Sequence, residues 1–175
     1  MIRVRTRAGA VLAAGAVALA AAGTAVAAHP ESGKKFSGTT SGPADNGFKP
    51  AVTFKTASNG ARILKFVFQS GGCFGSGGPT QPGVNYLAKP WNVHLVGTIK
   101  VGSDGKFSVK NAKSTYKVAV QGSTQSTVTT ASVSGKFTNR KTATGTITYS
   151  QAYSQPGVPG SSCGPVKLTF KATVK

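Results

Sequence analysis

Val166-Lys167-Leu168-Thr169-Phe170-Lys171-Ala172-Thr173, near the end of the chain, carries the clearest structural pattern in the sequence. Every second residue, beginning with Val166, is apolar, and the residues between them are Lys or Thr. This period of two is typical of a β-strand with one buried and one exposed face. No window from residue 31 onward repeats apolar residues at helical spacing, so the sequence predicts an all-β protein.

The same alternation recurs upstream, in segments separated by turns that contain Gly, Asn or Asp. With the C-terminal stretch, the predicted strands are about 36–40, 52–56, 62–69, 93–101, 107–109, 116–120, 127–138, 143–149 and 166–173. About nine short strands rich in Thr and Val predict an antiparallel β-sandwich, with a β-barrel as the alternative. Two Gly-, Pro- and Ser-rich segments, 70–90 and 150–165, are expected to be long loops.

The composition excludes most enzyme classes. The 175 residues suit one domain, and 21 Lys+Arg stand against 3 Asp+Glu, a formal net charge of +18. Glu31 is expected in an N-terminal tail, and Asp45 and Asp104 are expected in turns, so no carboxylate pair serves a glycosidase or a calcium site. His94 is a lone strand histidine, and no G-x-S-x-G surrounds a serine. We expect no catalysis, no cofactor and no metal.

The N-terminus has the layout of a secretory signal peptide. Arg3, Arg5 and Arg7 precede an apolar run over 11–22, and Ala25-Val26-Ala27 matches an A-x-A cleavage signal. A membrane anchor is the alternative, but the apolar run is shorter than the about 20 residues that a span needs. We therefore expect residues 1–27 to be a signal peptide, 28–35 a flexible lead-in and 36–175 the domain. The mature protein would be secreted, extracellular or associated with the cell envelope, with no transmembrane anchor.

Two cysteines, Cys73 and Cys163, allow one intramolecular disulfide, which an exported chain would form in an oxidising space. A metal pair and a nucleophilic cysteine are the alternatives. A metal site would need more ligands, and no histidine lies at a sequence spacing from either cysteine that would suggest an activating base. The disulfide would join the two expected loops.

The charge is the strongest sign of function. Without the signal peptide, 18 Lys+Arg face 3 acids, a net charge of +15, and 16 of these cations are Lys. Strand parity predicts solvent-facing positions for a set of lysines that would bind anionic cell-wall polymers: Lys55, Lys65, Lys100, Lys106, Lys110, Lys117, Lys167 and Lys171. The alternative is that these lysines protect sheet edges and keep the protein soluble. Because Lys predominates over Arg, no specific nucleic-acid recognition is expected.

Four aromatic residues in or near the expected loops indicate a second candidate site. They are Phe74, Tyr86, Trp91 and Tyr153. Aromatic faces on end loops suit a glycan or a protein partner. A small satellite core around the disulfide is one alternative, and a passive extracellular structural protein is a further alternative for the whole chain.

A set of short motifs carries a family resemblance. After the signal peptide come Phe36-Ser37-Gly38-Thr39-Thr40, a strand that runs into Cys73, and a late Cys163 before the closing strand. Between them lie Asp104-Gly105-Lys106-Phe107-Ser108, Val133-Ser134-Gly135-Lys136-Phe137 and Ala143-Thr144-Gly145-Thr146-Ile147. In these pieces the chain resembles, over about residues 36–173, a group of small secreted all-β proteins of high-GC Gram-positive bacteria, generally without assigned function. The resemblance implies the fold and export, and it brings no catalytic residues.

Overall fold

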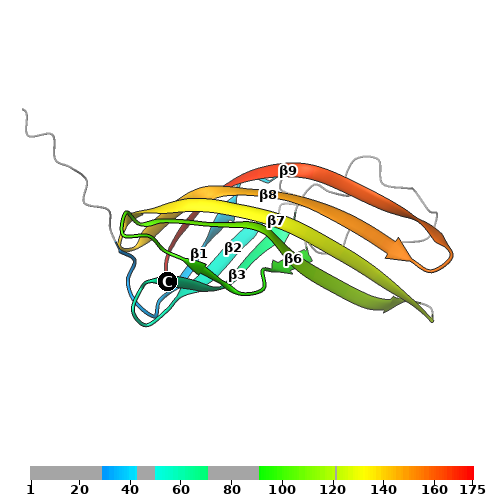
Figure 1. Cartoon of the computed structure of the whole chain (residues 1–175), viewed down its shortest axis with the longest axis horizontal. Coiled ribbons are helices and arrows are strands. Elements are labelled where there is room, and N and C mark those ends of the chain that lie inside the picture. The colour runs from blue at the N-terminus through cyan, green and yellow to red at the C-terminus, as the bar shows by residue number, and fades with distance from the viewer. Residues whose placement is uncertain (1–28, 43–49, 71–90, 121) are drawn as a thin grey trace, which may run out of the picture.

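The computed structural model describes residues 29–42, 50–70, 91–120 and 122–175 (Figure 1). Within these ranges the regular structure is entirely β. The strands are β1 (Lys35–Thr40), β2 (Ala51–Thr56), β3 (Arg62–Ser70), β4 (Trp91–His94), β5 (Thr98–Lys100), β6 (Lys106–Val120), β7 (Ser123–Asn139), β8 (Thr142–Gln155) and β9 (Val158–Val174). The prediction of an all-β fold of about nine strands is confirmed.

All nine strands belong to one antiparallel sheet, in the order β4-β3-β2-β1-β9-β8-β7-β6, with β5 paired to β3 beside β4. The ends of this sheet meet at a single point, where Val101 and Phe107 form an isolated antiparallel bridge. The sheet is therefore nearly closed into a barrel. Of the two predicted arrangements, the barrel describes this continuous sheet.

The strands fall into a group of short strands and a group of long strands. Strands β1 to β5 have three to nine residues, whereas β6 to β9 have 14 to 17. The four long strands run side by side and extend well past the short ones (Figure 1). We call the end with the Val101–Phe107 bridge and the β7–β8 turn the closed end. The extended end consists of the far parts of the long strands, residues 112–120, 122–131, 150–155 and 158–164.

One expected loop is in fact a hairpin. Residues 150–165, predicted to be a long loop, complete β8 and begin β9, which are joined by a turn at Pro156 and Gly157. The Gly and Pro residues of this segment concealed the strands because both residue types are usually depleted in strands. The other expected loop, residues 70–90, lies almost wholly outside the described residues.

Phenylalanines fill the closed end. Phe54 stacks between Phe36 and Phe66, with ring centroids 4.9 and 5.5 Å away, and Phe137 meets Phe36 edge-on at 5.4 Å. All four rings are at most 2% exposed. Burial of such large rings is the main source of stability in a small all-β domain.

Local irregularities change which residues face the core. Strict alternation would place Ile63 on the face opposite to Phe66, but both are buried, because the register shifts near Lys65, whose φ is 52°. A second shift occurs between Val109 and Ala112, where Asn111 has a φ of 51°. Each shift adds a residue to one strand and so reverses the inward parity that follows.

Residues 29–34, placed by the sequence in a flexible lead-in, make ordered backbone contacts. The Glu31 N–H donates to the Arg140 carbonyl at 2.9 Å, and the Thr56 hydroxyl donates to the Glu31 carbonyl at 2.6 Å. This short segment therefore packs on the closed end.

Candidate polyanion-binding surface

All eight lysines of the predicted polyanion-binding set are exposed. All are strand residues, and each except Lys110 and Lys117 adjoins a buried residue in the chain: Lys55, Lys65, Lys100, Lys106, Lys110, Lys117, Lys167 and Lys171. They come from β2, β3, β5, β6 and β9. The structure adds where these charges gather, which strand parity alone does not reveal.

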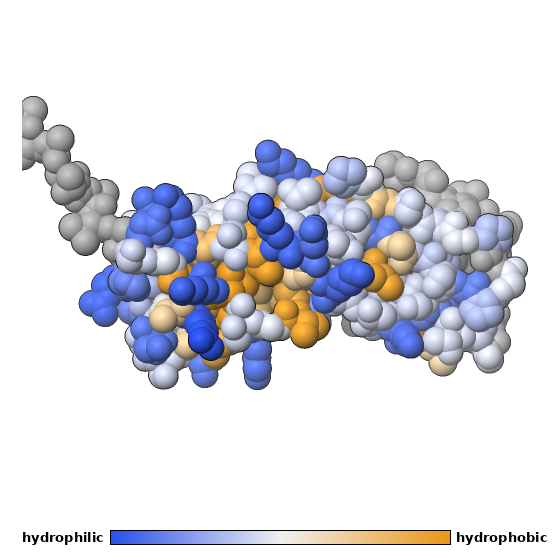
Figure 2. All heavy atoms as spheres, in the orientation of Figure 1, coloured by the Kyte–Doolittle hydropathy of each residue, from blue (hydrophilic) through white to orange (hydrophobic). Residues whose placement is uncertain are grey.

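The cations are unevenly distributed along the molecule. Of 16 Lys and Arg residues in the described ranges, two, Lys113 and Lys117, lie on the extended end. Residues 123–135 of β7, all of β8 and residues 158–166 of β9 carry no charged side chain. Strongly hydrophilic residues accordingly gather over the closed end and the middle, whereas the extended end is mostly pale (Figure 2). The molecule is therefore charge-segregated along its long axis.

Two pairs of lysines at the closed end lie directly opposite one another. Lys35 on β1 is the register partner of Lys55 on β2, and Lys106 on β6 is the partner of Lys136 on β7. Register partners point to the same face with Cβ atoms about 5 Å apart, and like charges in that position are destabilising. The Lys175 N–H donates to the Lys35 carbonyl at 3.0 Å, which adds a third lysine beside the first pair.

Few of these cations are neutralised. The Lys106 ammonium contacts the Asp104 carboxylate at 2.7 Å, and Lys141 contacts Glu31 at 3.8 Å. No other ion pair forms among the residues that the structure describes. The hydrogen bond between Asp104 and Lys106 lowers the pKa of Asp104 and raises that of Lys106. The predicted turn role of Asp104 is confirmed, since its carboxylate also accepts the Lys106 N–H at 3.0 Å.

Only two of the four residues of the aromatic candidate site lie within the described ranges. Phe74 and Tyr86 lie outside the described residues, and Trp91 opens β4. Tyr153, expected in a loop, lies on β8 with 9% of its surface exposed, and its hydroxyl donates to Gln155 at 2.6 Å. A buried ring of this kind cannot stack on a ligand at the surface.

The inner face of the extended end is a polar layer that the sequence analysis missed. Gln151 donates to the Thr129 hydroxyl at 3.0 Å, and Gln125 donates to Gln155 at 3.0 Å. Gln125, Thr129 and Gln151 are all buried, and each has a partner, as buried polar groups require. The recurrence of Gln and Thr at odd positions of the first part of β7, and of Gln at positions 151 and 155 of β8, is the signal that could have revealed it.

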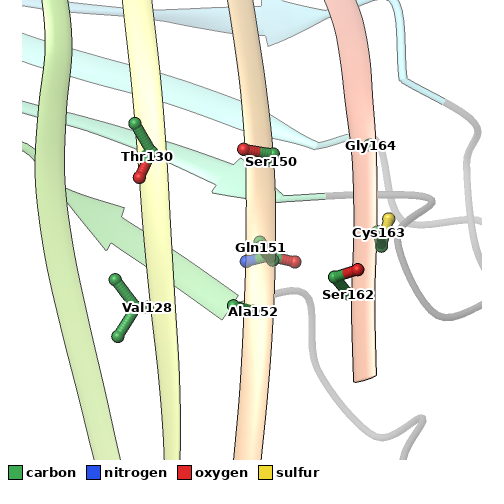
Figure 3. Close-up of a pocket in the computed structure, with 8 residues that line it drawn as sticks. All are labelled: Val128, Thr130, Ser150, Gln151, Ala152, Ser162, Cys163 and Gly164. Carbon is green, nitrogen blue, oxygen red and sulfur yellow. The ribbon is translucent and has the colours of Figure 1, made fainter. Parts of the chain in front are cut away.

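A hollow lies on β7, β8 and β9 where the extended end begins (Figure 3). It has a volume of about 310 Å³ and is lined by Val128, Thr130, Ser150, Gln151, Ala152, Ser162, Cys163 and Gly164. Its lining is uncharged and consists mainly of small side chains. It therefore offers no charged group to an anion.

His94 and the two cysteines complete the predicted positions. His94 lies exposed on β4, and in the described ranges no three His, Cys, Asp or Glu side chains gather as metal ligands. Cys163 lies on β9, half-buried, and it is not a free thiol. Its predicted partner Cys73 is outside the described residues, so the pairing itself stays a prediction.

Comparison of the chain with protein-family models, curated proteins and solved structures gives no match. In the ranges that the structure describes, no helix is long and apolar enough to cross a membrane.

Proposed function

We propose that this chain is an exported, non-catalytic protein that binds anionic polymers of the cell envelope through the lysines of its closed end. Export rests on the signal-peptide layout of residues 1–27, and the mature chain would carry the Cys73–Cys163 disulfide. The observation that carries the binding proposal is the pair of like-charge register contacts, Lys35–Lys55 and Lys106–Lys136.

The Lys35–Lys55 contact costs stability in the free protein because its two ammonium groups repel, whereas at the Lys106–Lys136 contact the Asp104 carboxylate, 2.7 Å from the Lys106 ammonium, offsets part of the repulsion. A bound chain of phosphates would place negative charge between the ammonium groups and remove this repulsion. Flexible lysines rather than arginines suit a polymer that is recognised by charge density and not by a fixed hydrogen-bond geometry. The ligand class is therefore a linear polyphosphodiester, such as the poly(glycerol phosphate) of bacterial walls.

Binding of the mature protein to poly(glycerol phosphate) over a range of salt concentrations tests the proposal. The double variant Lys35→Gln/Lys55→Gln should weaken binding and lower the slope of log K against log salt by roughly 1.4, about 0.7 for each phosphate that is no longer neutralised. The matched control Lys113→Gln/Lys117→Gln removes the same charge from the extended end and should leave the slope nearly unchanged.

Equal effects of the two double variants would contradict a closed-end site and would indicate attraction by net charge alone. No binding of the unsubstituted protein at low salt would overturn the proposal. Conversion of a broad set of hydrolase substrates by the purified protein, with activity abolished in His94→Ala, would contradict its non-catalytic part.

A further inference from the structure

We infer that the bound polymer carries neutral sugar substituents, and that the hollow on β7, β8 and β9 holds one of them. This inference rests on the proposed polymer site and defines its ligand more closely. Three features of the molecule support it: a row of lysines that leads to the hollow, hydroxyl groups in the lining that the fold leaves unused, and the absence of charge in the lining.

The outward side of β9 carries a regular row of lysines. Lys167 and Lys171 are exposed and lie four residues apart, about 13 Å, with one outward threonine between them. Lys175 continues the row, and its N–H donates to the Lys35 carbonyl at 3.0 Å. None of the three β9 lysines forms an ion pair in the described part of the chain. A linear polyanion held at the Lys35–Lys55 pair therefore meets further cations along β9.

This row of lysines ends where the hollow begins. Thr148 on β8 is the register partner of Lys167. Ser150, which lines the hollow, is the next outward residue of β8, about 7 Å farther along the strand. The outward side chains from there on are small: Ser150, Ala152 and Ser162. A polymer that follows β9 past Lys167 thus reaches a depression in the same face of the sheet.

The lining presents hydroxyl groups that the fold does not use. Thr130 on β7 and Ser150 on β8 are register partners, and they lie side by side in Figure 3. Within the described ranges, the hydroxyls of Thr130, Ser150 and Ser162 have no hydrogen-bonding partner. Val128 and Ala152, also register partners, supply methyl groups beside them. A sugar ring has the matching chemistry, with hydroxyls around its edge and C–H groups on its faces.

The hollow favours a neutral group of small size. Its lining has no cation for a further anionic group. A substituent with an ammonium group would meet no carboxylate, because Glu31 and Asp104, the acids among the described residues, both lie at the closed end. The volume of about 310 Å³ is at the low end of the roughly 300–1,000 Å³ of ligand pockets, which suits one sugar unit. The ligand is therefore a polyphosphodiester with single neutral sugars attached along its chain.

The test compares two poly(glycerol phosphate) samples of equal length, with and without glucosyl substituents, on the intact mature protein. The glucosylated polymer should bind about tenfold more tightly at physiological salt, because the sugar adds hydrogen bonds and apolar contact. The slope of log K against log salt should be the same for both polymers, since the sugar adds no phosphate contact. Lys167→Gln/Lys171→Gln should weaken binding of both polymers and leave the ratio of their affinities unchanged.

Variants of the lining locate the sugar. Ala152→Gln fills the hollow with a neutral side chain, so it should abolish the preference for the glucosylated polymer and keep the affinity for the unsubstituted one. The matched control is Ser154→Gln, at the next outward position of β8 and outside the lining, which should retain the preference. Thr130→Val removes one hydroxyl at nearly constant shape and should lower the preference several-fold.

Methyl glucoside at millimolar concentration gives a second measurement. It should shift the methyl resonances of Val128 in the unsubstituted protein and leave them in place in Ala152→Gln. Equal affinity for the two polymers, a preference that Ala152→Gln retains, or no shift at Val128 would each overturn the inference and leave the polymer site standing. No binding of either polymer at low salt would instead overturn the proposed function, and with it the ligand inferred from the hollow.

Discussion

Gly145 lies where no side chain fits. A Cβ built there would lie 2.7 Å from the Phe170 ring and closer still to the Ser134 carbonyl oxygen. A Cβ built at its register partner Gly135 would lie 2.5 Å from the Phe107 ring. Two phenylalanine rings thus cover the backbone of adjacent strands, and the short motifs that contain these glycines are packing motifs.

Gly145→Ala should destabilise the protein by about 1–3 kcal/mol, because the Phe170 ring and the neighbouring strand must move. The free energy of unfolding from urea titration measures this destabilisation. Gly160→Ala is the control, since its Cβ would meet only the Tyr153 carbonyl oxygen, at 3.3 Å, and it should cost less than about 0.5 kcal/mol. Equal effects of the two substitutions would contradict the packing role.

Tyr149 predicts how stability responds to alkaline pH. Burial raises the pKa of its hydroxyl from 10.0 to about 12. A group whose pKa is raised on folding contributes stability that is complete below its unfolded pKa and is lost as the pH rises through its folded pKa. Unfolding measured from about pH 9 to 12 should therefore show a decline that begins near pH 10. In Tyr149→Phe that part of the decline should be absent, and an unchanged profile would contradict the assignment.

At the scale of the element, the side-chain parity of β3, β6 and β9 changes within the strand. The change lies near Lys65 in β3, near Asn111 in β6, and at Gly164 and Pro165 in β9, where Cys163 and Val166 pair with Gln151 and Tyr149. Extra residues of this kind bend a strand and increase its twist. The irregularities in β6 and β9 lie where the extended end begins, so they mark where the long strands leave the core.

Asn111 should tolerate glycine but not a β-branched residue. Asn111→Val should cost about 1–2 kcal/mol, because a left-handed backbone brings Cβ against the carbonyl oxygen. Asn111→Gly should remain within about 0.5 kcal/mol of the unsubstituted protein. Thr115→Val, at an exposed extended position of the same strand, is the control for added apolar surface. Similar unfolding free energies for the two Asn111 variants would exclude strain at this residue.

At the scale of the whole molecule, charge is concentrated at the end where the strands are best packed. The lysines of β1, β2 and the C-terminus meet there, with Arg140 and Lys141 in the adjoining turn. Burial of the Phe-rich core at this end offsets the mutual repulsion of its lysines.

Relief of this repulsion should be measurable. Lys35→Gln should raise the free energy of unfolding by about 0.2–0.5 kcal/mol at low salt, and the gain should disappear at about 1 M salt, where charges are screened beyond about 3 Å. Lys55→Gln should raise the free energy of unfolding less in the Lys35→Gln background than in the unsubstituted protein. Independent effects of the two substitutions would show that the lysines do not interact.

Strand content, the outward position of the lysines and the turn at Asp104 were all predictable from the sequence. These features follow from a period of two and from turn chemistry, which depend on near neighbours in the chain. That the strands form one nearly closed sheet, that residues 150–165 are paired and that Ile63 faces inward became clear only from the folded chain. Strand order depends on pairing between distant segments, and a single inserted residue reverses every later side chain, so neither can be read from local alternation. The grouping of lysines at one end has the same cause, because β6 and β7, and β1 and β9, bring together residues that are far apart in the sequence.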